Sequence, residues 1–108
     1  MNKDTIYASL TKNQKTAISI IRVSGSQTKT ILKKLLKKEV KSKEINLRNI
    51  YDSDGEFIDQ GLILVFSKPR SPTGEDVVEF HVHGSVSIIK KIELELDKIK
   101  YVREAEPG

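Results

Sequence analysis

The chain has 108 residues, of which 37% are hydrophobic and 31% charged, and it contains neither cysteine nor tryptophan. This composition indicates a folded domain with an aliphatic core, and the lack of cysteine excludes a disulfide scaffold, a thiolate metal site and a cysteine nucleophile. The apolar runs are too short to span a bilayer and the first residues do not form an apolar signal region, so we expect a cytoplasmic protein with no membrane partner.

The net charge of +4 is unevenly distributed along the chain. Residues 1–50 hold twelve Lys and Arg against three acidic residues, whereas residues 51–108 hold seven against twelve. A basic half favours contact with a polyanion such as RNA. The alternative is a lysine-rich helix face that is simply solvated.

The first half of the chain predicts two strands and a helix. Thr5–Leu10 and Ala17–Val23 are rich in apolar and β-branched residues and predict strands, with a polar connection over Thr11–Lys15. Ser24-Gly25-Ser26 then breaks the second strand and offers a helix cap. Isoleucine and leucine recur at helical spacing among lysines, which predicts a helix over about residues 26–38.

The second half predicts a hairpin, a further strand and a second helix. After a polar loop at Lys41–Glu44, Ile45–Tyr51 and Phe57–Phe66 flank the turn signal Asp52-Ser53-Asp54-Gly55, which predicts a β-hairpin. A loop, a strand, a helix and a short last strand are expected over Ser67–Gly74, Asp76–Val82, Ser85–Lys98 and Tyr101–Ala105. Two main helices among largely antiparallel strands make α+β the expected fold class, in a single domain over residues 1–108.

The residues with the most chemistry lie on the strand that precedes Gly84. Side chains alternate between the two faces of a strand, so Val78, Phe80 and Val82 are expected in the core, and Glu79, His81 and His83 share the opposite face. Three interpretations are open. The polar face can be solvated without a role, it can hold a metal ion through two imidazoles and a carboxylate, or Glu79 can accept hydrogen bonds from a polar heterocycle.

Arg22 is a second unusual residue, because it lies in an otherwise apolar strand. An arginine at the end of a buried strand needs an acidic or anionic partner, or an outlet to solvent. Either it reaches water, or it is held near a ligand or a carboxylate. A phosphate-binding loop, a dinucleotide fingerprint and a serine nucleophile elbow are all absent from the sequence, so we assign no catalytic residue.

At these segments the sequence resembles the N-terminal domain of the MnmE (TrmE) family of tRNA-modification GTPases. The matching blocks follow the order of the family and cover nearly the whole chain. The most specific of them are Arg22-Val23-Ser24-Gly25, Thr73-Gly74-Glu75-Asp76-Val77-Val78-Glu79, His83-Gly84 and Glu106-Pro107-Gly108.

The resemblance implies a fold like the tetrahydrofolate-binding domain of the glycine-cleavage aminomethyltransferases. It implies that the domain binds a tetrahydrofolate one-carbon derivative, such as 5-formyl- or methylene-tetrahydrofolate, and joins two chains into a homodimer. It places folate contacts at Arg22 and Glu79, and it disfavours the metal interpretation. In the full family protein a helical domain and a GTPase domain, which takes GTP, Mg²⁺ and K⁺, act with the flavoprotein MnmG (GidA) on the wobble uridine of tRNA.

Three departures from the family pattern bear on the site. A Pro/Gly-rich segment with an arginine is replaced by Lys12-Asn13-Gln14-Lys15-Thr16, and the usual Gly-Gly is Gly84-Ser85. The chain also stops at Gly108, before a family lysine that contacts folate and before the GTPase motifs. We therefore expect a piece of the family protein that cannot perform the reaction alone. A purely structural dimerisation module and a basic RNA-contacting module remain as alternatives to folate binding.

Overall fold

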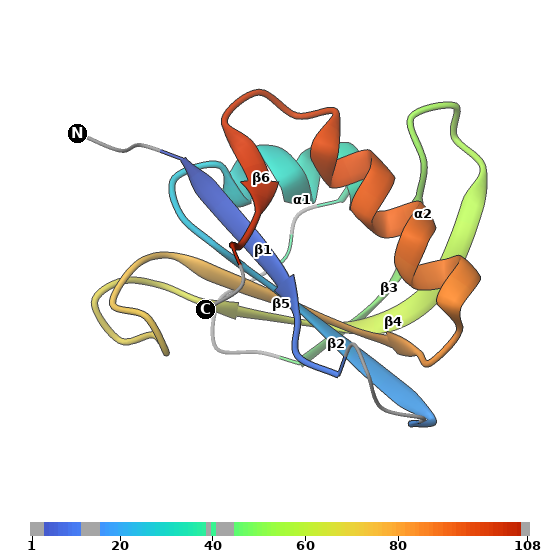
Figure 1. Cartoon of the computed structure of the whole chain (residues 1–108), viewed down its shortest axis with the longest axis horizontal. Helices are drawn as coiled ribbons and strands as arrows, with labels where there is room; N and C mark the ends of the chain where they lie inside the picture. Colours follow the sequence, from blue (N-terminus) through green and yellow to red (C-terminus); the bar gives the residue numbers. More distant parts are fainter. Residues whose placement is uncertain (1–3, 12–15, 39, 41–44, 107–108) are drawn as a thin grey trace.

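One mixed sheet and two helices make up the fold (Figure 1). The computed structural model describes residues 4–11, 16–38, 40 and 45–106. In chain order the elements are β1 (Thr5–Ser9), β2 (Ile18–Ser24), α1 (Thr28–Leu36), β3 (Ile45–Tyr51), β4 (Phe57–Phe66), β5 (Val77–His83), α2 (Val86–Asp97) and β6 (Val102–Glu104).

The six strands are arranged in the order β3-β4-β5-β2-β1-β6. Each described pair of neighbours is antiparallel except β1 with β6. Both helices lie on the same side of this sheet (Figure 1). The predicted α+β class, with a largely antiparallel sheet and two helices, is therefore confirmed. None of the described helices is long and apolar enough to cross a membrane.

The strand boundaries agree with the alternation and the turn residues of the sequence. The β3–β4 hairpin has the predicted bounds, because Asp52 Oδ1 accepts the backbone N–H groups of Asp54 and Glu56, both at 2.9 Å. Gly55 completes this turn with a φ of 83°. Each of the other strands differs from its prediction by one residue at one or both ends. The connection expected at Lys41–Glu44 lies outside the described residues, as does most of the one at Thr11–Lys15.

Ser85, where the second helix was expected to begin, is its N-cap, but the cap expected for α1 at Ser24-Gly25-Ser26 is wrong. The N-cap of α1 is Gln27, which makes no capping hydrogen bond through its side chain. Its backbone N–H donates instead to Thr5 Oγ1 at 2.8 Å. Gly25 approaches β1 so closely that a Cβ there would lie 2.6 Å from the same oxygen. Residues 25–27 are thus a turn packed on β1, and the helix begins only at Thr28.

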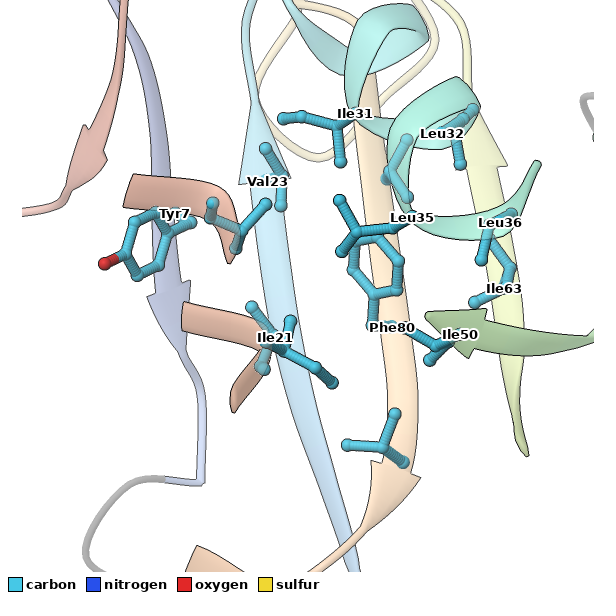
Figure 2. Packing of buried hydrophobic residues seen from close by; sticks show 14 of the residues in the cluster. Tyr7, Ile21, Val23, Ile31, Leu32, Leu35, Leu36, Ile50, Ile63 and Phe80 are labelled. Atoms are coloured by element: carbon cyan, nitrogen blue, oxygen red, sulfur yellow. The ribbon is translucent and has the colours of Figure 1, made fainter. Parts of the chain in front are cut away.

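The core fills the space between the helices and one face of the sheet (Figure 2). Figure 2 shows Phe80 beside Leu35 of α1, between Ile21 and Val23 of β2 on one side and Ile50 and Ile63 on the other. Val78, Phe80 and Val82 are at most 1% exposed, which confirms that they face the core. Apart from Phe80 and Tyr7 the buried cluster is aliphatic, as the composition predicts.

No described helix covers the other face of the sheet, which we call the open face. By the register of the strands, this face carries Glu79 together with a set of large apolar side chains that are 36–73% exposed, namely Ile6, Leu10, Ile18, Ile45, Leu47 and Leu62. An apolar surface of this kind, rimmed by polar groups, is typical of a binding or association site.

Candidate functional site

Arg22 and Glu79 meet at the centre of the sheet. β2 and β5 pair antiparallel with Arg22 directly opposite Glu79, and both side chains lie on the open face. The apolar residues before and after them in each strand turn to the core, so the polar pair lies on the face of the sheet opposite to the core. The two residues that the sequence singles out are thus brought together.

The carboxylate of Glu79 is held by three N–H groups. Its Oε2 accepts Nε of Arg22 at 2.9 Å and Nη2 at 2.8 Å, and its Oε1 lies 3.0 Å from Nε2 of His81. The side chain of Glu79 is only 10% exposed, and that of Arg22 is 33% exposed. Of the two alternatives for Arg22, the structure shows the carboxylate partner. We call Arg22, Glu79 and His81 the carboxylate cluster.

Opposing effects act on the pKa of Glu79. Burial is the largest single one, and it raises the pKa because it disfavours the charged form. The hydrogen bonds from His81 and Arg22, with the charges of both, together outweigh burial and lower the pKa below its ordinary value. Glu79 is therefore an ionised, nearly buried acceptor at neutral pH.

His83 is held by a different carboxylate. Asp59 of β4, whose side chain is 9% exposed, accepts the backbone N–H of His83 at 3.0 Å and lies 2.9 Å from its Nδ1. The imidazole of His83 is 68% exposed. The two histidines therefore have separate partners, and no group of three potential metal ligands lies close enough to hold an ion within the described ranges. The structure gives no support to a metal site built from Glu79, His81 and His83.

Two open cavities flank the carboxylate cluster. One of about 290 Å³ lies over β4 and β5, and its wall includes His81, His83, Ile18 and Leu62. The other, of about 190 Å³, lies on the side of β1, where its lining includes Arg22. The two partners of Glu79 thus each line one cavity, whereas Glu79 itself lines neither.

Sequence reasoning missed two features of the site. One is the role of Asp59, and the other is the set of hydrogen bonds that hold the loop before β5. Asp59 contacts a histidine 24 residues away, and no local pattern predicts such a pair. Ser24 at the end of β2 shares a hydrogen bond of 2.7 Å with Thr73 and donates to Glu75 Oε1 at 3.2 Å. The Thr-Gly-Glu-Asp segment is thus tied to the strand that carries Arg22.

Comparisons with known proteins agree on one family. The profile described as "GTP-binding protein TrmE N-terminus" matches residues 5–108. The "tRNA modification GTPase MnmE" of Anaplasma phagocytophilum is 42% identical over 106 residues, which cover 97% of this chain and 23% of the relative.

Two further relatives give similar values. The "tRNA modification GTPase gtpbp3, mitochondrial" of Dictyostelium discoideum is 40% identical over 114 residues, with 98% of this chain and 22% of the relative covered. The MnmE protein of Mannheimia succiniciproducens is 39% identical over 108 residues, with 100% and 24% covered. The chain spans about a quarter of the length of these curated relatives.

Proposed function

The chain belongs to the family of TrmE N-terminal domains, and from this membership we propose that it binds a tetrahydrofolate one-carbon derivative at Arg22 and Glu79. The derivative is 5-formyl- or methylene-tetrahydrofolate. The same proposal includes a fold related to that of the folate-binding aminomethyltransferases and a homodimer of two such domains.

The ionised state of the Glu79 carboxylate is the observation that carries the ligand proposal. A pterin ring presents an amino group and a ring N–H side by side, and a carboxylate accepts such a pair of donors when it is ionised. Glu79 offers an ionised carboxylate on the open face, with cavities beside it. Arg22 keeps that carboxylate oriented and supplies the charge that keeps it ionised.

The open face supports the homodimer. Its apolar side chains surround the carboxylate cluster without a described helix above them, so a second copy of the domain would remove them from water. Burial of this kind is the main driving force of association.

We place the domain within a tRNA-modification GTPase in the cytoplasm. In the whole protein, a GTPase domain outside this chain binds GTP, Mg²⁺ and K⁺, and the flavoprotein MnmG and tRNA are partners. The domain described here supplies the folate that donates a carbon to the wobble uridine. The alternative is a purely structural dimerisation module that binds no folate, and a ligand-binding assay distinguishes the two.

A second candidate function rests on the charge of α1. Its outer surface and the residues after it carry five exposed lysines, Lys29, Lys33, Lys34, Lys37 and Lys38. The helix contains no acidic residue, and none of these lysines has a carboxylate partner among the described residues. A surface of this kind contacts RNA phosphates without reading sequence.

Thermal unfolding tests the folate proposal. A ligand that binds only the native state raises the melting temperature, and its stabilisation grows as RT ln(1 + [L]/Kd), where [L] is the free ligand concentration. We expect 5-formyltetrahydrofolate to raise the Tm of the chain, whereas p-aminobenzoylglutamate, which lacks the pterin, should not. Equal melting temperatures with and without the reduced folate, up to millimolar concentration by order of magnitude, would contradict the proposal.

A further inference from the structure

Asp59 and His83 form a side-chain pair to which the proposed function gives no role. The two oxygens of the Asp59 carboxylate lie 2.9 and 3.0 Å from Nδ1 of His83, and Oδ2 also accepts the backbone N–H of His83 at 3.0 Å. The side chain of Asp59 is 9% exposed, whereas the imidazole is 68% exposed. A nearly buried carboxylate thus holds an exposed imidazole in one orientation.

The carboxylate also decides which ring nitrogen of His83 carries the proton. An ionised carboxylate only accepts hydrogen bonds, so the nitrogen that faces it, Nδ1, is the N–H donor of the neutral imidazole. Nε2 then carries a lone pair, and within the described residues it has no hydrogen-bond partner. This lone pair is available to a ligand that offers an N–H or O–H group.

His83 lines the larger of the two cavities on the open face. The rest of the wall of this 290 Å³ cavity is mainly apolar and includes Ile18, Leu47 and Leu62. Ile18 lies directly opposite His83 in the pairing of β2 with β5. The cavity therefore combines apolar side chains with the free acceptor of His83, an arrangement that suits an aromatic ring followed by an N–H group.

The spacing along β5 relates this cavity to Glu79. His83 follows Glu79 by four residues in the strand, and a strand rises about 3.3 Å per residue, so about 13 Å separates the two. A reduced folate is elongated, and its pterin is followed by the p-aminobenzoyl ring and then by the amide N–H of the glutamyl group. A folate whose pterin binds Glu79 and whose tail follows β5 has its ring at the cavity and its amide N–H at His83.

We propose that the Asp59–His83 pair is part of the folate site and that Nε2 of His83 accepts the amide N–H of the p-aminobenzoyl-glutamate tail. Asp59 is a positioning residue here, because it acts on the ligand only by fixing the tautomer of His83. The inference rests on the proposed function and adds to it the direction of the ligand, from Glu79 along β5 to the larger cavity. It also makes His83 a specificity-determining residue, which favours an amide over an ester that offers no N–H.

The substitution Asp59→Asn tests the tautomer. The amide oxygen of the new side chain must still accept the backbone N–H of His83, so its NH2 group faces Nδ1, which becomes an acceptor. The ring proton then lies on Nε2. Long-range ¹H–¹⁵N spectra at pH 8.5, about two units above the ordinary imidazole value, should show Nε2 unprotonated in the wild type and protonated in the variant. The same tautomer in both proteins would contradict the role of Asp59.

Calorimetric titration at this pH with two ligands tests the contact to the tail. For 5-formyltetrahydrofolate, Asp59→Asn should weaken binding about tenfold, because a hydrogen bond is lost and two donors then face each other. The methyl ester of 5-formyltetrahydropteroate has an ester oxygen in place of the amide N–H, so the same substitution should not weaken its binding. His83→Ala should also weaken binding of 5-formyltetrahydrofolate, and adding Asp59→Asn to it should have no further effect.

The matched control is Asp52→Asn. Asp52 also accepts backbone N–H groups through its side chain, at the turn between β3 and β4, but it touches neither histidine. This variant should bind both ligands as the wild type does. A loss of affinity equal to that of Asp59→Asn would show a general effect of the substitution and would contradict the inference.

The outcomes separate the inference from the proposed function. If 5-formyltetrahydrofolate binds in a Glu79-dependent manner and Asp59→Asn weakens both ligands equally, or neither, the contact to His83 is overturned and the proposed function stands. A wild type that binds neither ligand would overturn the proposed function, and the inference with it. If Asp59→Asn does not fold, His83→Ala decides with the same two ligands, because it removes the acceptor and leaves Asp59 on the backbone N–H; an equal loss for both ligands, or none, would contradict the inference.

Discussion

At the residue scale, Glu79 is the ionised acceptor at the centre of the open face. Strand alternation alone places it opposite Val78 and Phe80 and predicts that Glu79→Gln hardly changes folding. The structure adds two protein partners and almost complete burial, so the side chain also contributes to stability. Alternation can assign a face to Glu79, but the partners depend on the pairing of β2 with β5, which no local pattern encodes.

Glu79→Gln should weaken the binding of 5-formyltetrahydrofolate about 10- to 100-fold, because hydrogen bonds to a charged group contribute roughly 1.5–3 kcal/mol. The substitution keeps the shape, but it replaces an acceptor oxygen by an amide donor that faces a donor. Calorimetry well below the melting temperature of the variant measures the effect. Lys90→Gln, at an exposed position of α2 away from the open face, serves as the control. Equal affinities of wild type and Glu79→Gln would refute the assignment of this pocket.

The lowered pKa of Glu79 makes a second prediction, on acid stability. A carboxyl group with a depressed pKa in the folded state stabilises the fold above its unfolded pKa, and this stability is lost as the pH falls through the folded pKa. The free energy of unfolding of the wild type should therefore fall between about pH 5 and pH 3. The slope should be smaller in Glu79→Gln, as chemical denaturation at a series of pH values can show. Parallel slopes would mean that Glu79 titrates alike in both states.

At the scale of elements, the sequence predicts where helices and strands lie along the chain better than it predicts which segments contact one another. The hairpin of β3 and β4 follows from its turn residues, and the bounds of α2 follow within one residue from hydrophobic spacing after Gly84. The start of α1 does not, because the close approach of Gly25 to Thr5 is a tertiary contact between segments about twenty residues apart. Local signals thus fix an element where no distant packing competes with them.

The lysines of α1 should contribute positive charge to the surface and little to the stability of the fold. Glutamine has nearly the helix propensity of lysine, so replacing Lys33, Lys34, Lys37 and Lys38 by Gln should leave the melting temperature nearly unchanged. One small loss is expected from Lys37, whose Nζ lies 5.3 Å from the centre of the Tyr51 ring. Any affinity for tRNA should drop in the variant and vanish with modest salt in the wild type.

Filter binding at several salt concentrations measures this effect. The control is the replacement of Lys90 and Lys91 of α2 by Gln, which removes two exposed charges from the other helix. A tRNA complex that is sequence-selective, survives high salt and depends on the α1 lysines would contradict the prediction, since α1 itself carries no aromatic side chain to stack on bases.

At the scale of the whole molecule, the open face is the main finding that the sequence leaves unresolved. The pattern shows apolar residues on both faces of β4, but the core and the exposed face look alike until the positions of the helices are known. The strand order brings Ile6, Ile18, Leu62 and Leu47 from four strands onto one surface. That order follows from pairings between distant segments, so it could not be predicted from local periodicity.

The chain should self-associate through this surface. Ile45→Lys with Leu47→Lys places two charges at side chains of β3 that are 73% and 55% exposed, and it should shift the protein towards the monomer. The matched control is Val86→Lys with Leu94→Lys, at apolar positions of α2 that are 70% and 60% exposed on the other side of the molecule. Sedimentation at tens of micromolar, an order of magnitude suited to weak dimers, measures the change. A strictly monomeric wild type, or equal effects of the two pairs, would rule out association by the open face.

The pairing of β2 with β5 also orders the events of folding. Arg22 and Glu79 are 57 residues apart, whereas β3 and β4 are joined by a tight turn. Closing a long loop costs more conformational entropy than closing a short one, so the hairpin can form early and the central pair late. During synthesis, Arg22 is made long before its carboxylate exists. The proposed binding pocket therefore appears only when nearly the entire domain has folded, and a ligand bound there would report completed folding rather than guide it.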